Sequence, residues 1–139
     1  MPHVIRQDEY ATLWYHPGPK VIHHKIHRFV PAGIFQEILT AGAVILEQDR
    51  ASKWLSDDSD HTVVRNADLD WARSTWGPRV VRAGLKYWGI VPPRQTIGQM
   101  QTDQIVSDGK ALGLTIKTFV NDAAARAWLG GVDRTIEPR

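Results

Sequence analysis

The chain has 139 residues, of which 42% are hydrophobic and 23% charged, and its formal net charge is +2. This length and composition predict one folded domain with one core and exclude a disordered or collagen-like chain. Because the chain has no cysteine, it cannot form disulfides, a thiol nucleophile or cysteine-bound zinc, and no apolar run is long enough to span a bilayer. These features predict a cytoplasmic protein without a membrane partner, and the small net charge does not by itself indicate nucleic-acid binding.

The N-terminal third predicts a β-hairpin followed by a helix. Residues 9–15 and 20–29 have strand composition, and the turn-forming segment His16-Pro17-Gly18-Pro19 separates them. Because neither face of the second strand is purely apolar, the pattern favours an edge position for it. Apolar residues then recur at helical spacing and predict an amphipathic helix over residues 32–48.

The middle of the chain predicts a short strand, an acidic loop and a bent helix. The strand covers residues 53–56, and the run Asp57-Asp58-Ser59-Asp60 follows it directly. Asn66 is a suitable N-cap for the next helix. Pro78 is expected to bend or restart this helix, because proline lacks the amide hydrogen that an interior helical position donates.

The C-terminal half predicts a regular alternation of strands and helices. Residues 86–91 are apolar on both faces, as in a central strand. Residues 96–112 and 114–119 predict a helix and a further strand, and Asn121 is a suitable N-cap for a last helix.

This order of elements predicts an α/β fold with one domain. The sheet is expected to be mixed but mostly parallel, with helices on both faces and an antiparallel N-terminal hairpin. The domain should cover residues 1–131, and residues 132–139 should form a loose C-terminal tail. Ligands of open α/β sheets collect at the carboxyl ends of the strands, so we expect any site near the acidic loop.

A group of aromatic, acidic and turn residues forms a diffuse signature over about residues 10–130. It consists of Lys53-Trp54-Leu55-Ser56-Asp57, Asp70-Trp71, Trp76, Pro78, Gly84, Lys86-Tyr87-Trp88, Phe119, Asn121-Asp122 and Ala127-Trp128-Leu129. Together these residues resemble the signature of stand-alone bacterial STAS-like proteins, whose fold is that of anti-sigma-factor antagonists. The resemblance implies a four- or five-stranded sheet flanked by helices, a homodimer, and no established enzymatic reaction.

The same resemblance makes Ser59 a candidate phosphorylation site. Anti-sigma-factor antagonists carry a phosphorylatable serine after an aspartate where a strand passes into a helix, and Asp58-Ser59 occupies a similar location. The chain departs from their pattern at the next residues. Asp60-His61-Thr62 follows here, whereas the antagonists continue with Ser-Ser/Thr-Gly-Leu directly into the helix.

The acidic loop admits several interpretations. Asp57, Asp58 and Asp60 could bind a hard cation or supply paired carboxylates for acid–base chemistry. No glycine sets a cation-binding turn there, and no basic residue lies among them. We therefore favour a solvated loop in which these side chains bond exposed backbone amides.

The six histidines raise the question of a metal site. His23 and His27 share one face of a strand but lie about 13 Å apart along it, too far for one ion to bind both directly. His16 or His61 could join one of them through the fold. We favour exposed strand histidines without a role, and the sequence predicts neither a metal nor another cofactor.

Between Trp71 and Thr102 the chain has no acidic residue, and arginines alternate with aromatic residues. Single-stranded nucleic acid is bound by such a combination, because bases stack on aromatic rings and cations neutralise phosphates. We favour the interpretation in which the aromatic residues cover the sheet. Arg79 and Arg82 are then expected to contact an acidic face of a partner, for instance a second copy of the chain.

The six tryptophans separate into two groups. Trp54, Trp88 and Trp128 fit the core, whereas Trp71 and Trp76 could line an apolar cleft beside the acidic loop. We favour the interpretation in which these two indoles simply pack in the protein.

The sequence thus predicts a non-catalytic binding or regulatory module that acts through protein–protein contacts as a homodimer. Its predicted binding residues are Asp57, Asp58, Ser59, Trp71 and Trp76. The alternative is a carrier with a pocket for a small apolar ligand between the helix after Asn66 and the sheet. A third, weaker hypothesis is a metal-dependent enzyme that uses the aspartates.

Overall fold

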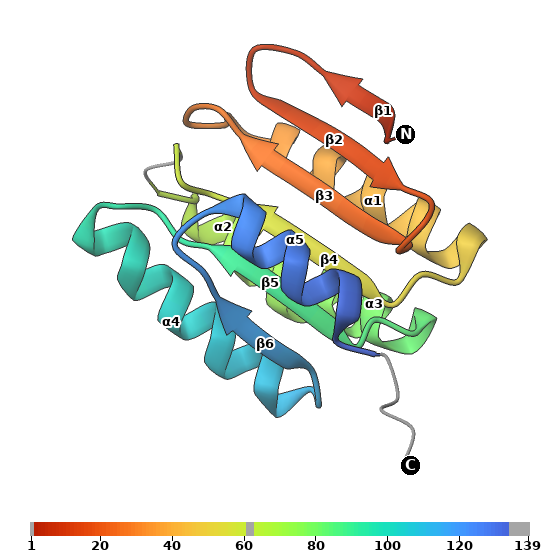
Figure 1. Ribbon diagram of the computed structural model, residues 1–139. Coiled ribbons are helices and arrows are strands. Elements are labelled where there is room, and N and C mark those ends of the chain that lie inside the picture. The colour runs from red at the N-terminus through yellow and green to blue at the C-terminus, as the bar shows by residue number, and fades with distance from the viewer. Residues whose placement is uncertain (1, 61–62, 134–139) are drawn as a thin grey trace.

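The computed structural model describes residues 2–60 and 63–133, which form one six-stranded sheet with helices on both faces (Figure 1). The strands lie side by side in sequence order: β1 (His3–Gln7), β2 (Ala11–His16), β3 (Val21–Ile26), β4 (Lys53–Asp57), β5 (Tyr87–Val91) and β6 (Thr115–Thr118). The first three strands pair antiparallel, and β3 to β6 pair parallel. The predicted α/β class, the mostly parallel sheet and the N-terminal hairpin are confirmed.

The N-terminal part of the sheet differs from the prediction in two ways. β1 is an additional strand, and because none of its residues is buried it has no apolar face to reveal it in the sequence. β3 lies between β2 and β4 rather than at an edge, and five of its six residues are buried. The sheet therefore has six strands, not the four or five that the resemblance implies.

Three helical segments connect the parallel strands. They are α1 (Ile34–Asp49), the continuous segment α2 (Asn66–Trp71), η1 (Ala72–Trp76) and α3 (Gly77–Ala83), and α4 (Thr96–Ala111). The five residues of η1 have the wider turn of a π-helix, and α3 begins directly after them with Pro78 in its first turn. This agrees with the restart expected at Pro78.

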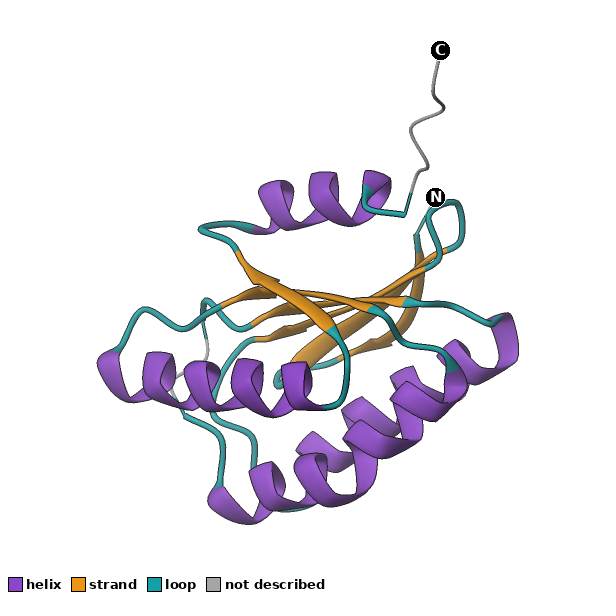
Figure 2. Ribbon diagram, turned by 90° about the horizontal axis from the view of Figure 1, so that it is seen from below, coloured by secondary structure: helices purple, strands orange, loops and turns teal. Residues whose placement is uncertain are grey.

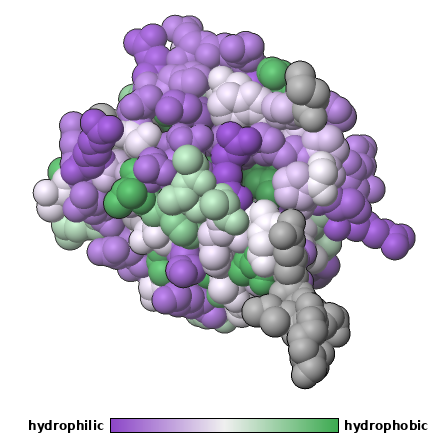
Figure 3. Space-filling view, in the orientation of Figure 1, coloured by the Kyte–Doolittle hydropathy of each residue, from purple (hydrophilic) through white to green (hydrophobic). Residues whose placement is uncertain are grey.

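The connecting helices all lie on one face of the sheet, and α5 (Asp122–Gly131) covers the other face (Figure 2). Each crossover moves one strand further in the same direction, so the right-handed rule places every connecting helix on the same side. Seen from the α5 side, hydrophobic residues form small groups separated by hydrophilic ones (Figure 3).

The sheet separates two hydrophobic clusters. The larger lies between the sheet and the connecting helices and includes Trp54, Trp76 and Ile38. The smaller lies under α5 and contains Val21, Leu55, Val91, Ala125 and Leu129.

Two further observations concern the ends and the helices. Val132 and Asp133 form a turn after α5, and the rest of the expected tail, residues 134–139, lies outside the described residues. Within residues 2–60 and 63–133, no helix has the length and apolar character needed to cross a bilayer.

Candidate functional site

The acidic residues after β4 do not form one cluster. Side chains alternate along an extended chain, so Asp57 lies on the α5 face of the sheet and Asp58 lies on the face of the connecting helices. Asp57 is buried, whereas Asp58 lines a pocket under those helices. The carboxyl edge of the sheet therefore holds two separate candidate sites.

Ser59 is bonded to Asp57. Its amide and its hydroxyl both donate to Asp57 Oδ1, at 3.2 and 2.6 Å. Lys25 Nζ lies 3.5 Å from Asp57 Oδ2 and 3.4 Å from Asp60 Oδ2, so the neighbouring strand supplies the basic residue that the loop lacks. Burial by itself would raise the pKa of Asp57, but the bonds from Ser59 and the charge of Lys25 outweigh it and hold that pKa below its usual value.

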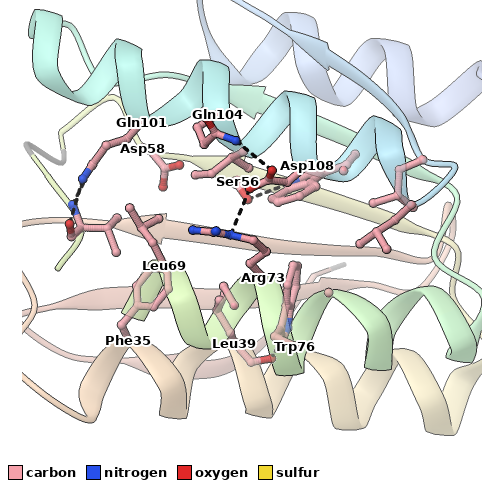
Figure 4. A pocket seen from close by; sticks show the side chains of 18 of the residues that line it. Phe35, Leu39, Ser56, Asp58, Leu69, Arg73, Trp76, Gln101, Gln104 and Asp108 are labelled. Atoms are coloured by element: carbon pink, nitrogen blue, oxygen red, sulfur yellow. Dashed lines mark hydrogen bonds and ion pairs between the residues drawn. The ribbon is translucent and has the colours of Figure 1, made fainter. Parts of the chain in front are cut away.

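The pocket beside Asp58 lies between α1, η1, α4 and the sheet, and its volume is about 100 Å³ (Figure 4). Its walls are mostly apolar. Among the side chains that line it are Phe35, Leu39, Leu69, Ala72, Trp76, Trp88, Ile105 and Leu114. Of the five residues predicted for the site, Asp58 and Trp76 line the pocket, whereas Asp57, Ser59 and Trp71 do not.

Two tryptophans form a fixed wall of the pocket. Trp76 Nε1 donates to the Leu39 carbonyl at 3.1 Å, and Trp88 Nε1 donates to Ser56 Oγ at 2.8 Å. The two rings meet edge to face, with centroids 5.5 Å apart. Because both indole N–H groups are bonded to the protein, the rings offer carbon surface to a ligand.

A chain of hydrogen bonds holds Asp58 at the pocket. Trp54 Nε1 donates to His24 Nδ1 at 3.1 Å, and His24 Nε2 lies 3.2 Å from Asp58 Oδ1. An indole N–H can only donate, so His24 Nδ1 accepts, and the proton of the neutral ring is on Nε2, from which it is donated to Asp58. The histidine thus orients the carboxylate.

Polar side chains from η1 and α4 form the mouth of the pocket. Arg73 points from η1 toward Asp108 of α4, with Nε 3.4 Å from Oδ2 (Figure 4). Gln104 Nε2 donates to Asp108 Oδ1 at 2.8 Å. Gln101 closes the far end, where its side chain bonds both the amide and the carbonyl of Val64 at 2.9 Å.

Arg73 and the residues from α4 were not predicted as site residues from the sequence. Gln101, Gln104, Ile105 and Asp108 recur at spacings of three and four, which places them on one face of a helix. This mostly polar stripe was a usable signal, but only the fold shows that it faces a pocket.

Other predictions for polar residues need correction. His23 and His24 are buried, at 4% and 3% exposed, and not exposed strand histidines, because each bonds another side chain. Arg79 bonds Glu47 of the same chain through two contacts, at 2.8 and 2.9 Å, where a contact with a partner was expected. His61 lies outside the described residues.

Comparisons with models of protein families, with curated proteins and with solved structures find no match. A fold by itself does not define a function, so the function must be inferred from the chemistry of the site.

Proposed function

We propose that the protein binds a small, flat, largely apolar molecule that carries a hydrogen-bond donor. The observation that supports this best is the pocket itself, in which two immobilised indole rings face a space that also contains an oriented carboxylate. This is the carrier function that the sequence analysis gave as its alternative. The homodimeric protein-binding module stays a prediction.

The volume restricts the size of the ligand. An apolar cavity of about 150 Å³ holds one benzene molecule, so a pocket of about 100 Å³ limits the ligand to at most a single ring or a short chain. A ligand of about seven non-hydrogen atoms can supply about 5 kcal/mol of binding free energy, well under the ceiling for such molecules. This corresponds to a Kd of about 0.2 mM.

The polar groups restrict the chemistry of the ligand. Asp58 accepts a hydrogen bond from His24, and a carboxylate has capacity for further donors. Asp108 adds a second carboxylate at the mouth, where Arg73 partly neutralises it. A phenol or an aromatic amine therefore suits the pocket, whereas an aromatic carboxylate would be repelled.

Titration of the protein with phenol tests the proposal, read by tryptophan fluorescence and by the indole N–H signals of Trp76 and Trp88 in NMR spectra. We expect saturable binding with a Kd of about 0.2 mM. Benzoate should bind at least tenfold more weakly, and Asp58→Asn should reduce the preference for phenol over benzene.

Ala72→Leu provides the matched test of location. Ala72 lines the pocket, so the larger side chain should fill it and weaken phenol binding at least tenfold. The control is Ala111→Leu, the same substitution at an exposed position of α4 that is not among the lining residues. No saturable change with phenol up to about 10 mM, or equal binding by the Ala72→Leu variant, would rule out this function.

A further inference from the structure

A second group of polar side chains lies on the opposite face of the sheet, beneath the start of α5. His23 comes from β3, Asp57 from the end of β4, and Asp122 from the first turn of α5. One nitrogen of His23 and one oxygen of each carboxylate all lie within 4.8 Å of one another. These three residues are separate from the pocket lining.

His23 has an unused nitrogen at this place. The residue is only 4% exposed, and its ring packs against Trp14 and His16, with centroids 4.5 and 5.3 Å away. Nδ1 is bonded to His16 Nε2 at 3.0 Å, whereas Nε2 has no hydrogen-bond partner in the described part of the chain. Buried polar atoms are nearly always paired, so an unpaired nitrogen on a ring that lies beside two carboxylates calls for an explanation.

A second proton on the His23 ring does not explain the unpaired nitrogen. Burial lowers the pKa of His23 to about 3, and the charges that His16, His24 and Arg126 carry when protonated act in the same direction, although the charge of Asp57 acts in the opposite direction. If Nδ1 carries its proton and donates it to His16, Nε2 presents a lone pair, which is the form of histidine that binds metals, with the other nitrogen held by an outer partner.

We propose that His23, Asp57 and Asp122 bind one divalent transition-metal ion, with Zn²⁺ as the best match. One imidazole nitrogen and two carboxylate oxygens suit Zn²⁺, which accepts such ligands at about 2.0 to 2.2 Å. Ligand atoms of a tetrahedral ion lie about 3.4 Å apart, so the carboxylates must move inward by about an ångström. Asp122 is only half-buried and can make this adjustment.

Lys25 competes with the ion for Asp57. Its Nζ lies 3.5 Å from Asp57 Oδ2, and Asp60 shares this ammonium group at 3.4 Å. The charge of Arg126 also acts on His23. Removal of the positive charge of Lys25, which lies beside Asp57, should therefore strengthen metal binding. With three protein ligands, the ion keeps a coordination position for water.

The test is titration of the full chain, first dialysed against a chelator, with ZnCl₂ by isothermal calorimetry. We expect one ion per chain with a Kd of 10 µM or tighter, since three protein ligands converge. His23→Gln and Asp122→Asn should each weaken binding at least tenfold, and Lys25→Met should strengthen it. CoCl₂ gives a second readout, because Co²⁺ in a tetrahedral site absorbs visible light more strongly than the hydrated ion does.

Two controls test whether the ion binds at this site. His27→Gln changes a histidine of the same region that bonds Thr12 on β2, and the Ala72→Leu variant closes the pocket on the other face. Both should retain zinc binding, so the two proposals can fail separately. Asp122 is only half-buried, so its variant is informative even if His23→Gln does not fold.

Three results would overturn the proposal. They are the absence of 1:1 zinc binding below about 100 µM, binding that persists in Asp122→Asn, and equally tight Mg²⁺ binding that does not depend on His23. Such Mg²⁺ binding would indicate that the carboxylates alone bind the ion, since Mg²⁺ prefers oxygen ligands.

Discussion

His23 and His24 are adjacent in the sequence and lie in different chemical surroundings. His24 has both ring nitrogens paired, one with Trp54 and one with Asp58, and so serves to orient a carboxylate. In the described part of the chain His23 has only one nitrogen paired, and its ring lies near two carboxylates. Residue type alone does not distinguish these roles, because the role depends on which partners each face of the sheet provides.

Gly42 of α1 shows the same dependence on a neighbour. A methyl group at this position would overlap the indole ring of Trp54, which is fully buried. We expect Gly42→Ala to lower the free energy of unfolding by about 1 to 3 kcal/mol, as overpacking of a rigid core does, despite the better helix propensity of alanine.

Urea unfolding measures this change, with Gly130→Ala as the control. Gly130 also lies in a helix, but a methyl group there meets no atom within 4 Å. The control should be neutral or slightly stabilising. Equal stability of Gly42→Ala and the natural chain would show that Trp54 can move, and the fixed geometry of the Trp54–His24–Asp58 chain would then be wrong.

At the scale of elements, the two predicted helix caps have different outcomes. The Asn121 side chain accepts a hydrogen bond from the Ala124 amide at 2.9 Å, so this prediction is confirmed. Asn66 is wrong as an N-cap, because α2 begins one residue earlier than expected, with Arg65 at the cap position and no side-chain bond. Both residues have the right chemistry, and the conformation of the preceding loop decides which is used.

Because only Asn121 makes a cap hydrogen bond, substitution by alanine should have unequal effects at the two positions. Asn121→Ala should lower the free energy of unfolding by about 1 kcal/mol, since an amide at the start of α5 loses its acceptor. Asn66→Ala should change it by less than about 0.5 kcal/mol, because Asn66 is exposed and makes no cap bond. Urea denaturation measures both changes, and the slope of the free energy of unfolding against urea concentration should stay unchanged. A larger loss of free energy for Asn66→Ala than for Asn121→Ala would contradict the assignment of the caps.

At the scale of the whole molecule, the sequential strand order determines where the sites lie. All crossover helices share one face, so the pocket forms there, and α5 alone encloses the second group of polar residues on the other face. The short acidic segment at the end of β4 contributes one carboxylate to each.

The sheet lies between the two hydrophobic clusters. We therefore expect the clusters to contribute independently to the free energy of unfolding. Ile38 belongs to the larger cluster and Leu129 to the smaller, and both are fully buried. We expect Ile38→Val to cost about 1 kcal/mol and Leu129→Ala about 3 kcal/mol. The double variant should lose the sum within about 0.5 kcal/mol, measured by urea unfolding. A coupling above about 1 kcal/mol would mean that strain passes through the sheet.

The sequence by itself determined the order of the elements from β2 onward and the mostly parallel character of the sheet. These properties follow from local patterns, because hydrophobic periodicity, turn residues and caps act over a few neighbouring positions. Two of the residues predicted for the site, Asp58 and Trp76, do line the pocket. β1 escaped prediction because an exposed edge strand needs no apolar face.

Only the tertiary structure decided which side chains meet. Arg73 and Asp108 lie 35 positions apart in the sequence, and His23, Asp57 and Asp122 come from three separate elements. Their contacts depend on the strand order and on the face that each side chain takes, and a shift of one residue in register would reverse that face. No local pattern carries this information, because burial and proximity result from the packing of the whole chain.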